Sequence, residues 1–75
     1  MVPLAMLRDG DAGTIVAIHG GRGLMRRLAE LGFIKGERVR VLRSGPGPIL
    51  VLVKGARIAL GHGIAMKIFV SEEPS

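Results

Sequence analysis

A chain of 75 residues is long enough for one domain with a small core, and the lack of cysteine excludes disulfides and thiolate metal sites. Apolar residues make up 48% of the sequence, which excludes a disordered chain, and with only two phenylalanines the core must be largely aliphatic. Eleven Lys and Arg against six Asp and Glu give a net charge of +5, which fits a solvated basic surface or a polyanionic partner: nucleic acid, an acidic protein or a membrane surface.

No segment is apolar for long enough to cross a membrane. The longest aliphatic run covers residues 49–53, whereas a spanning helix needs roughly 20 residues. The apolar start of the chain, residues 1–7, is too short for a signal peptide and lacks its basic beginning. We therefore expect a cytoplasmic protein with no direct membrane insertion.

The N-terminal part of the chain is predicted to form two strands. Residues 1–7 are expected to be a short edge strand anchored by Leu4 and Leu7, followed by a turn rich in Asp and Gly at residues 8–11. A β-branched run within residues 12–19 predicts the second strand.

One amphipathic helix is predicted over residues 21–31. Its buried face is indicated by leucines at i, i+4 and i+7, namely Leu24, Leu28 and Leu31. Gly32 suits the left-handed position that ends a helix, and the ring of Phe33 is expected to fold back on the last turn.

The second half of the chain is predicted to consist of strands separated by turns. Alternating or continuous apolar residues predict strands over residues 38–43, 49–53, 56–60 and 67–70. Residues 64–66 are expected to form one helical turn, and residues 71–75 a frayed polar tail. Short strands at intervals of about ten residues predict a mainly β single domain over residues 1–75, folded as a small barrel or rolled sheet with one inserted helix.

The predicted core consists of the inward-facing aliphatic residues of these elements: Ile15, Ile18, Leu24, Leu28, Leu31, Val39, Val41, Val51, Ile58, Leu60, Ile68 and Val70. The strand over residues 49–53 has no polar face, so Leu50 and Leu52 would point away from this core. Two alternatives are open for these leucines. They are exposed as a contact surface, or residues 1–6 pack over them.

The sequence offers no set of catalytic residues. The serines Ser44, Ser71 and Ser75 do not lie in a nucleophile elbow, so we expect no enzyme activity. The candidate metal ligands are His19, His62, Asp9, Asp11, Glu30 and Glu37. A ferrous site of two histidines and one carboxylate would need both histidines, and nothing in the sequence brings them together. We predict no specific metal site and no cofactor.

Several short motifs follow one another in a recognisable order. An opening Leu7 and Gly10, a glycine pair after the second strand, and a closing pattern of apolar residues flank a central motif, Arg27-Leu28, Leu31-Gly32 and Gly36. Together they resemble the FeoA family of small ferrous-iron transport accessory proteins. The resemblance implies an SH3-like β-barrel and a cytoplasmic, non-enzymatic role supporting FeoB, the membrane GTP-binding transporter of ferrous iron. The same domain resembles the C-terminal module of metal-dependent repressors of the DtxR type.

The sequence and the resemblance together favour a protein that acts by binding another protein. The candidate contact residues are Arg22, Met25 and Arg26 on the outer side of the helix, and Leu50 and Leu52 on the apolar strand. Exposed aliphatic residues mark sites of contact with a partner or of self-association. The alternative is a nucleic-acid-binding barrel or a module associated with a metal-dependent repressor. The absence of Tyr and Trp disfavours nucleic acid, since small barrels stack bases on exposed aromatic rings.

Overall fold

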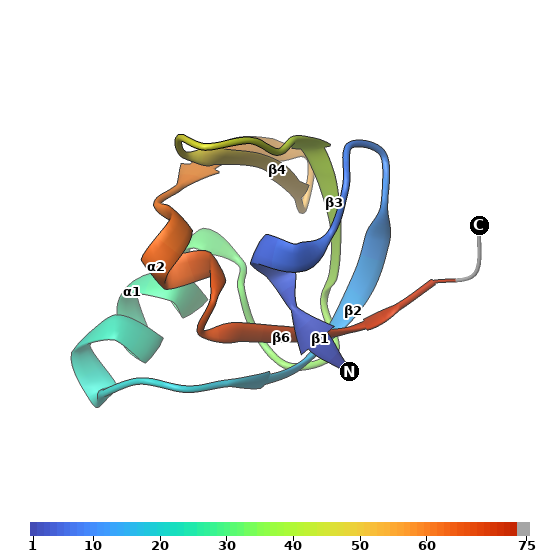
Figure 1. The fold of residues 1–75 in the computed structure, drawn as a ribbon. Coiled ribbons are helices and arrows are strands. Elements are labelled where there is room, and N and C mark those ends of the chain that lie inside the picture. Colours follow the sequence, from blue (N-terminus) through green and yellow to red (C-terminus); the bar gives the residue numbers. More distant parts are fainter. Residues whose placement is uncertain (74–75) are drawn as a thin grey trace.

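The computed structural model describes residues 1–73, in which six strands form one antiparallel sheet that rolls around the core (Figure 1). The strands are β1 (Val2–Pro3), β2 (Ala12–Ile18), β3 (Arg38–Arg43), β4 (Ile49–Val53), β5 (Ala56–Leu60) and β6 (Ile68–Glu72). Their order in the sheet is β1-β6-β2-β3-β4-β5, and the end strands β1 and β5 do not pair with each other. The predicted mainly β fold is confirmed, as a rolled sheet that stays open rather than as a closed barrel.

The helix α1 (Arg22–Leu31) lies within the predicted range. It follows Gly21, which caps the helix with no side-chain hydrogen bond, and it ends at Gly32, whose φ of 105° is left-handed. The N–H of Gly32 donates to the carbonyl of Ala29 at 3.0 Å, and the N–H of Phe33 donates to the carbonyl of Leu28 at 2.9 Å. This glycine turn directs the chain back under the helix.

Two shorter helices complete the structure. A 3-10 turn, η1 (Leu4–Met6), follows β1, and the short helix α2 (His62–Ala65) precedes β6. Leu4 and Leu7 are buried, as predicted for the anchors of the N-terminal segment. However, β1 pairs with β6, and η1 lies against β6 and α2, so this segment closes one end of the sheet and does not cover the outer side of β4.

The core is the inner face of the sheet together with one residue each from η1, α1 and α2, and with Leu7 and Phe33 from the segments that follow η1 and α1. Its buried members are Leu4, Leu7, Ile15, Leu28, Phe33, Val39, Val41, Ile49, Val51, Val53, Leu60, Ala65, Ile68 and Val70. The partly buried Ile18, Leu24 and Ile58 pack against it.

The prediction that Leu31 belongs to the core was wrong, because this side chain is 43% exposed. Leu31 is the last residue of α1, and the turn at Gly32 brings Phe33 into the core in its place. Phe33 is 1% exposed, so its ring lies deeper than a residue that only covers the end of the helix.

The C-terminal segment is ordered further than predicted. β6 continues through Glu72, and the N–H of Glu73 donates to the carbonyl of Ala12 at 2.9 Å. Ser71 and Glu72, which were expected in a frayed tail, therefore pair with β2 instead. Residues 74 and 75 of that predicted tail lie outside the described residues.

Candidate docking site

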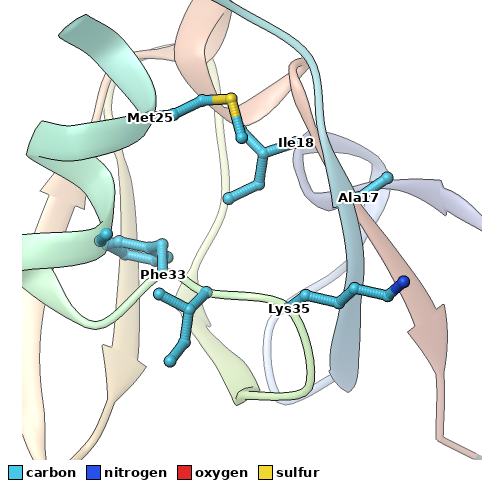
Figure 2. Close-up of a pocket in the computed structure, with 7 residues that line it drawn as sticks. Ala17, Ile18, Met25, Phe33 and Lys35 are labelled. Atoms are coloured by element: carbon cyan, nitrogen blue, oxygen red, sulfur yellow. The ribbon is translucent and has the colours of Figure 1, made fainter. Parts of the chain in front are cut away.

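An apolar pocket of about 340 Å³ opens between β2, α1 and the segment that follows α1 (Figure 2). Ala17 and Ile18 line it from β2, Met25 and Ala29 from α1, and residues 33–35 complete the wall. Figure 2 shows Met25 and Phe33 on one side, with Ala17 and Ile18 facing them from β2.

Small side chains line this pocket on both sides, Ala17 from β2 and Ala29 from α1. Ala17 follows a β-bulge in β2, where the register with β6 shifts after Ile15. A bulge bends the strand locally and re-aims its side chains. On the opposite wall, Ala29 leaves open the space that a longer side chain on α1 would fill. The buried Phe33 forms part of the lining, while Met25 and Ile34 are 44% and 41% exposed.

Positive charges surround this apolar lining. Arg22 and Arg26 are exposed and lie three residues before Met25 and Ala29, so they are their neighbours on the helix surface. Lys35 lines the pocket directly. The salt bridges found within residues 1–73, Arg38–Glu73 and Lys54–Glu37, involve none of these three cations. The pocket can therefore receive an apolar side chain whose neighbours are acidic.

The five predicted contact residues lie on two separate surfaces. Met25 lines the pocket, and Arg22 and Arg26 flank it on α1. Leu50 and Leu52 are half-buried on the outer side of β4, and neither lines the pocket. Figure 1 shows β4 at the top of the molecule and α1 at the lower left. The five residues therefore form two patches, one at the pocket and one on β4, and their role in binding stays a prediction.

Sequence reasoning missed most of the pocket lining. Ile18 was expected only as a core residue, and Ala17, Ala29, Ile34 and Lys35 were not singled out. One signal was available. Met25 and Ala29 are four residues apart and lie beside the leucine stripe on the helix. The apolar surface of α1 is therefore wider than the stripe that packs on the core.

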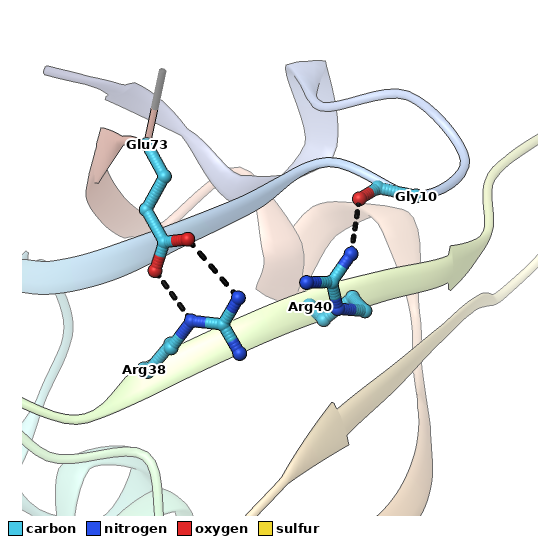
Figure 3. Close-up of polar contacts among 4 residues, drawn as sticks. All are labelled: Gly10, Arg38, Arg40 and Glu73. Carbon is cyan, nitrogen blue, oxygen red and sulfur yellow. Dashed lines mark hydrogen bonds and ion pairs between the residues drawn. The ribbon is translucent and has the colours of Figure 1, made fainter. Parts of the chain in front are cut away.

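Outside the pocket, polar contacts connect β3 with the residue that follows β6 and with the turn before β2 (Figure 3). The Arg38 guanidinium pairs with the Glu73 carboxylate through two hydrogen bonds, one of them from Nη2 to Oε2 at 3.0 Å. This pairing lowers the pKa of Glu73 and raises the pKa of Arg38. Arg40 donates from Nη1 to the Gly10 carbonyl at 2.7 Å.

A second carboxylate holds the loop after β3. Asp9 Oδ1 accepts hydrogen bonds from the backbone N–H of Ser44 at 2.6 Å and from its hydroxyl at 2.7 Å. These bonds, with a smaller effect from the charge of Arg43, lower the pKa of Asp9. The Asp9 carboxylate thus has a structural role, because it joins the turn before β2 to the loop before β4.

Residues 1–73 contain neither a group of metal-binding side chains nor a helix that could span a membrane. No three His, Cys, Asp or Glu side chains in this range are close enough together to hold a metal ion. The His19 ring packs against Phe69, with ring centroids 4.5 Å apart and planes tilted by 43°. In the same range, no helix is long and apolar enough to cross a membrane.

Comparison with known proteins points to one family. A family model described as the FeoA domain matches residues 2–72. Fe(2+) transport protein A of Methanocaldococcus jannaschii is 39% identical over 72 residues, which cover 96% of this chain and 88% of that relative.

Solved structures that resemble the whole fold include two FeoA proteins. A crystal structure of an iron uptake regulatory protein, FeoA, superposes with a TM-score of 0.92 at 38% identity, covering 96% of this chain and 97% of the other. FeoA of Stenotrophomonas maltophilia, complexed with zinc and described as a prokaryotic SH3 domain protein, superposes with a TM-score of 0.84 at 33% identity. That match covers 97% of this chain and 96% of the other.

Proposed function

Because the chain belongs to the FeoA family, with its SH3-like fold, we propose that it supports ferrous iron uptake by docking on the cytosolic part of a FeoB-type membrane GTPase. The protein acts by binding and catalyses no reaction of its own. Its place of action is the cytoplasm, where the nucleotide-binding part of such a transporter would be accessible.

The observation that carries this proposal is the apolar pocket between β2 and α1 with its cationic border. A pocket of about 340 Å³ has room for a large apolar side chain of a partner. Full burial of such a side chain stabilises a complex by about 1.5–3 kcal/mol. Arg22, Arg26 and Lys35 would meet acidic residues around that side chain, which adds specificity and speeds association.

Co-purification with a FeoB-type transporter solubilised from membranes tests the docking site. Met25→Asp places a carboxylate in the pocket lining and should strongly reduce recovery of the complex. Met6→Asp is the matched control, because Met6 is also exposed, at 64%, but lies on η1 outside the pocket.

A second pair of variants tests the charged border on the same helix. Arg26→Glu should weaken recovery, while Arg27→Glu should not, because position 27 is turned toward the opposite side of α1 from Met25 and Ala29. Equal recovery of all four variants and the wild type would contradict docking through this pocket.

A further inference from the structure

The outer side of β3, β4 and β5 carries a surface that the pocket does not use. The cross-strand register places Arg40 beside Leu52 and Leu52 beside Arg57 in one row. A second row runs from Arg43 through Leu50 to Ala59. We call these six residues the outer face. The alternate residues of β4, Ile49, Val51 and Val53, are 0–1% exposed and point into the core, so the leucines of the outer face point away from it.

The three strands of this face contain arginines and no acidic residue. One arginine of β3, Arg38, is paired with Glu73 and is left out of the outer face. Arg40 donates to a backbone carbonyl and forms no salt bridge in the described part of the chain (Figure 3), although its charge adds to the effect of Arg38 in lowering the pKa of Glu73. Asp9 is the carboxylate close to Arg43, and two hydrogen bonds from Ser44 hold it. Arg57 forms no salt bridge with any residue from 1 to 73.

Leu50 and Leu52 occupy the centre of this positive surface. They are half-buried because they lie between neighbouring strands, and arginine stems can cover aliphatic groups while their charged heads stay in water. In Figure 1 the described helices lie on the inner side of β4, which leaves the outer face uncovered. Aliphatic side chains between arginines that form no salt bridge within residues 1–73 match a lipid surface, where phosphates meet the cations and the acyl boundary receives the leucines.

We propose that the outer face rests on an anionic lipid bilayer, without any segment crossing it. The absence of an aromatic side chain among its six residues argues against single-stranded nucleic acid, which stacks its bases on aromatic rings. The pocket lies on another surface, so contact with lipid leaves it free. This proposal goes beyond docking on the transporter and does not depend on it.

Sedimentation with lipid vesicles tests the proposal. The wild type should bind vesicles of phosphatidylcholine containing phosphatidylglycerol, bind pure phosphatidylcholine far more weakly, and dissociate as salt is added. The variant R40Q/R43Q/R57Q should bind about 100-fold more weakly, at roughly fivefold for each arginine near an anionic surface. The matched control R8Q/R27Q/K67Q removes the same number of charges from exposed positions outside the outer face and should bind within about threefold of the wild type.

A second variant and a competitor keep the test decisive if the triple variant folds poorly. Leu50→Asn retains every charge and should weaken binding several-fold, since it removes an aliphatic group from the contact. Equal loss in both triple variants, or no binding by the wild type, would overturn the proposal. Displacement from vesicles by a single-stranded oligonucleotide or a polyglutamate peptide at lower concentration than lipid would also overturn it, in favour of that partner. The vesicles contain no transporter, so failure here would leave docking through the pocket intact.

Discussion

Replacing Leu28 by alanine tests how α1 is held on the sheet. Leu28 is 2% exposed and is the one buried residue of the helix, while Leu24 is half-buried and Leu31 is 43% exposed. The change removes three carbons from the core, worth about 2.4 kcal/mol at about 0.8 kcal/mol each. With the cavity left behind, the total loss is about 2–5 kcal/mol. A domain of this size has about 4–11 kcal/mol of stability.

Urea unfolding and thermal melting followed by circular dichroism measure this loss. A loss of about 3 kcal/mol should lower the melting temperature by about 10–25 °C. Leu31→Ala is the matched control on the same helix. Its side chain is already 43% exposed and water fills the vacated space, so we expect a loss of at most about 1 kcal/mol. Equal losses for the two variants, or an unchanged melting point for Leu28→Ala, would refute this account of how α1 is attached.

Three further predictions concern the sheet and its ends. Gly13→Ala should lower the free energy of unfolding, measured in urea, by about 1–3 kcal/mol, because the added Cβ would lie 2.8 Å from the carbonyl oxygen of Ser71 on the neighbouring strand β6. Gly32→Ala should cost about 1–2 kcal/mol by the same measurement, since its φ of 105° disfavours any side chain. Glu73→Gln should lower the melting temperature at pH 7, and its difference from the wild type should shrink as the pH falls below about 5. The Arg38 pairing lowers the pKa of Glu73 in the folded protein, so the ion pair stabilises the fold above the pKa that Glu73 has in the unfolded chain. This stabilisation is lost as the pH falls and the carboxylate is protonated. A difference in melting temperature between the two proteins that stays the same at every pH would contradict this.

The helix and the strands could be predicted from the sequence because their signals are local. Helical spacing of the leucines and a glycine at position 32 placed α1 to within one residue, and alternation in β3 identified Val39 and Val41 as inward-facing. The resemblance to FeoA proteins, confirmed by the family match, supplied the SH3-like arrangement that local patterns alone left open between a barrel and a rolled sheet.

The pocket could not be predicted, because it depends on distant elements. Ala17 and Ala29 are small residues with no distinctive pattern, and they line one pocket only because the fold places β2 beside α1. Leu31 fits the helical repeat, but the repeat does not show that the turn after the helix places Phe33 in the core instead. The separation of Leu50 and Leu52 from the helix is likewise a property of strand order, which the sequence leaves undetermined.

Docking through the pocket is tested most directly by filling it. Ala29→Phe places a ring in the pocket from an exposed helix position, and Ala56→Phe adds the same ring at the exposed start of β5. Binding of each labelled variant to a purified FeoB-type transporter in detergent would be titrated by fluorescence. We predict that Ala29→Phe weakens binding by about ten- to a hundredfold, the worth of one buried apolar side chain, and that Ala56→Phe binds as the wild type does. Equal affinity of Ala29→Phe and the wild type, with both proteins folded, would contradict the proposal that the pocket receives the transporter.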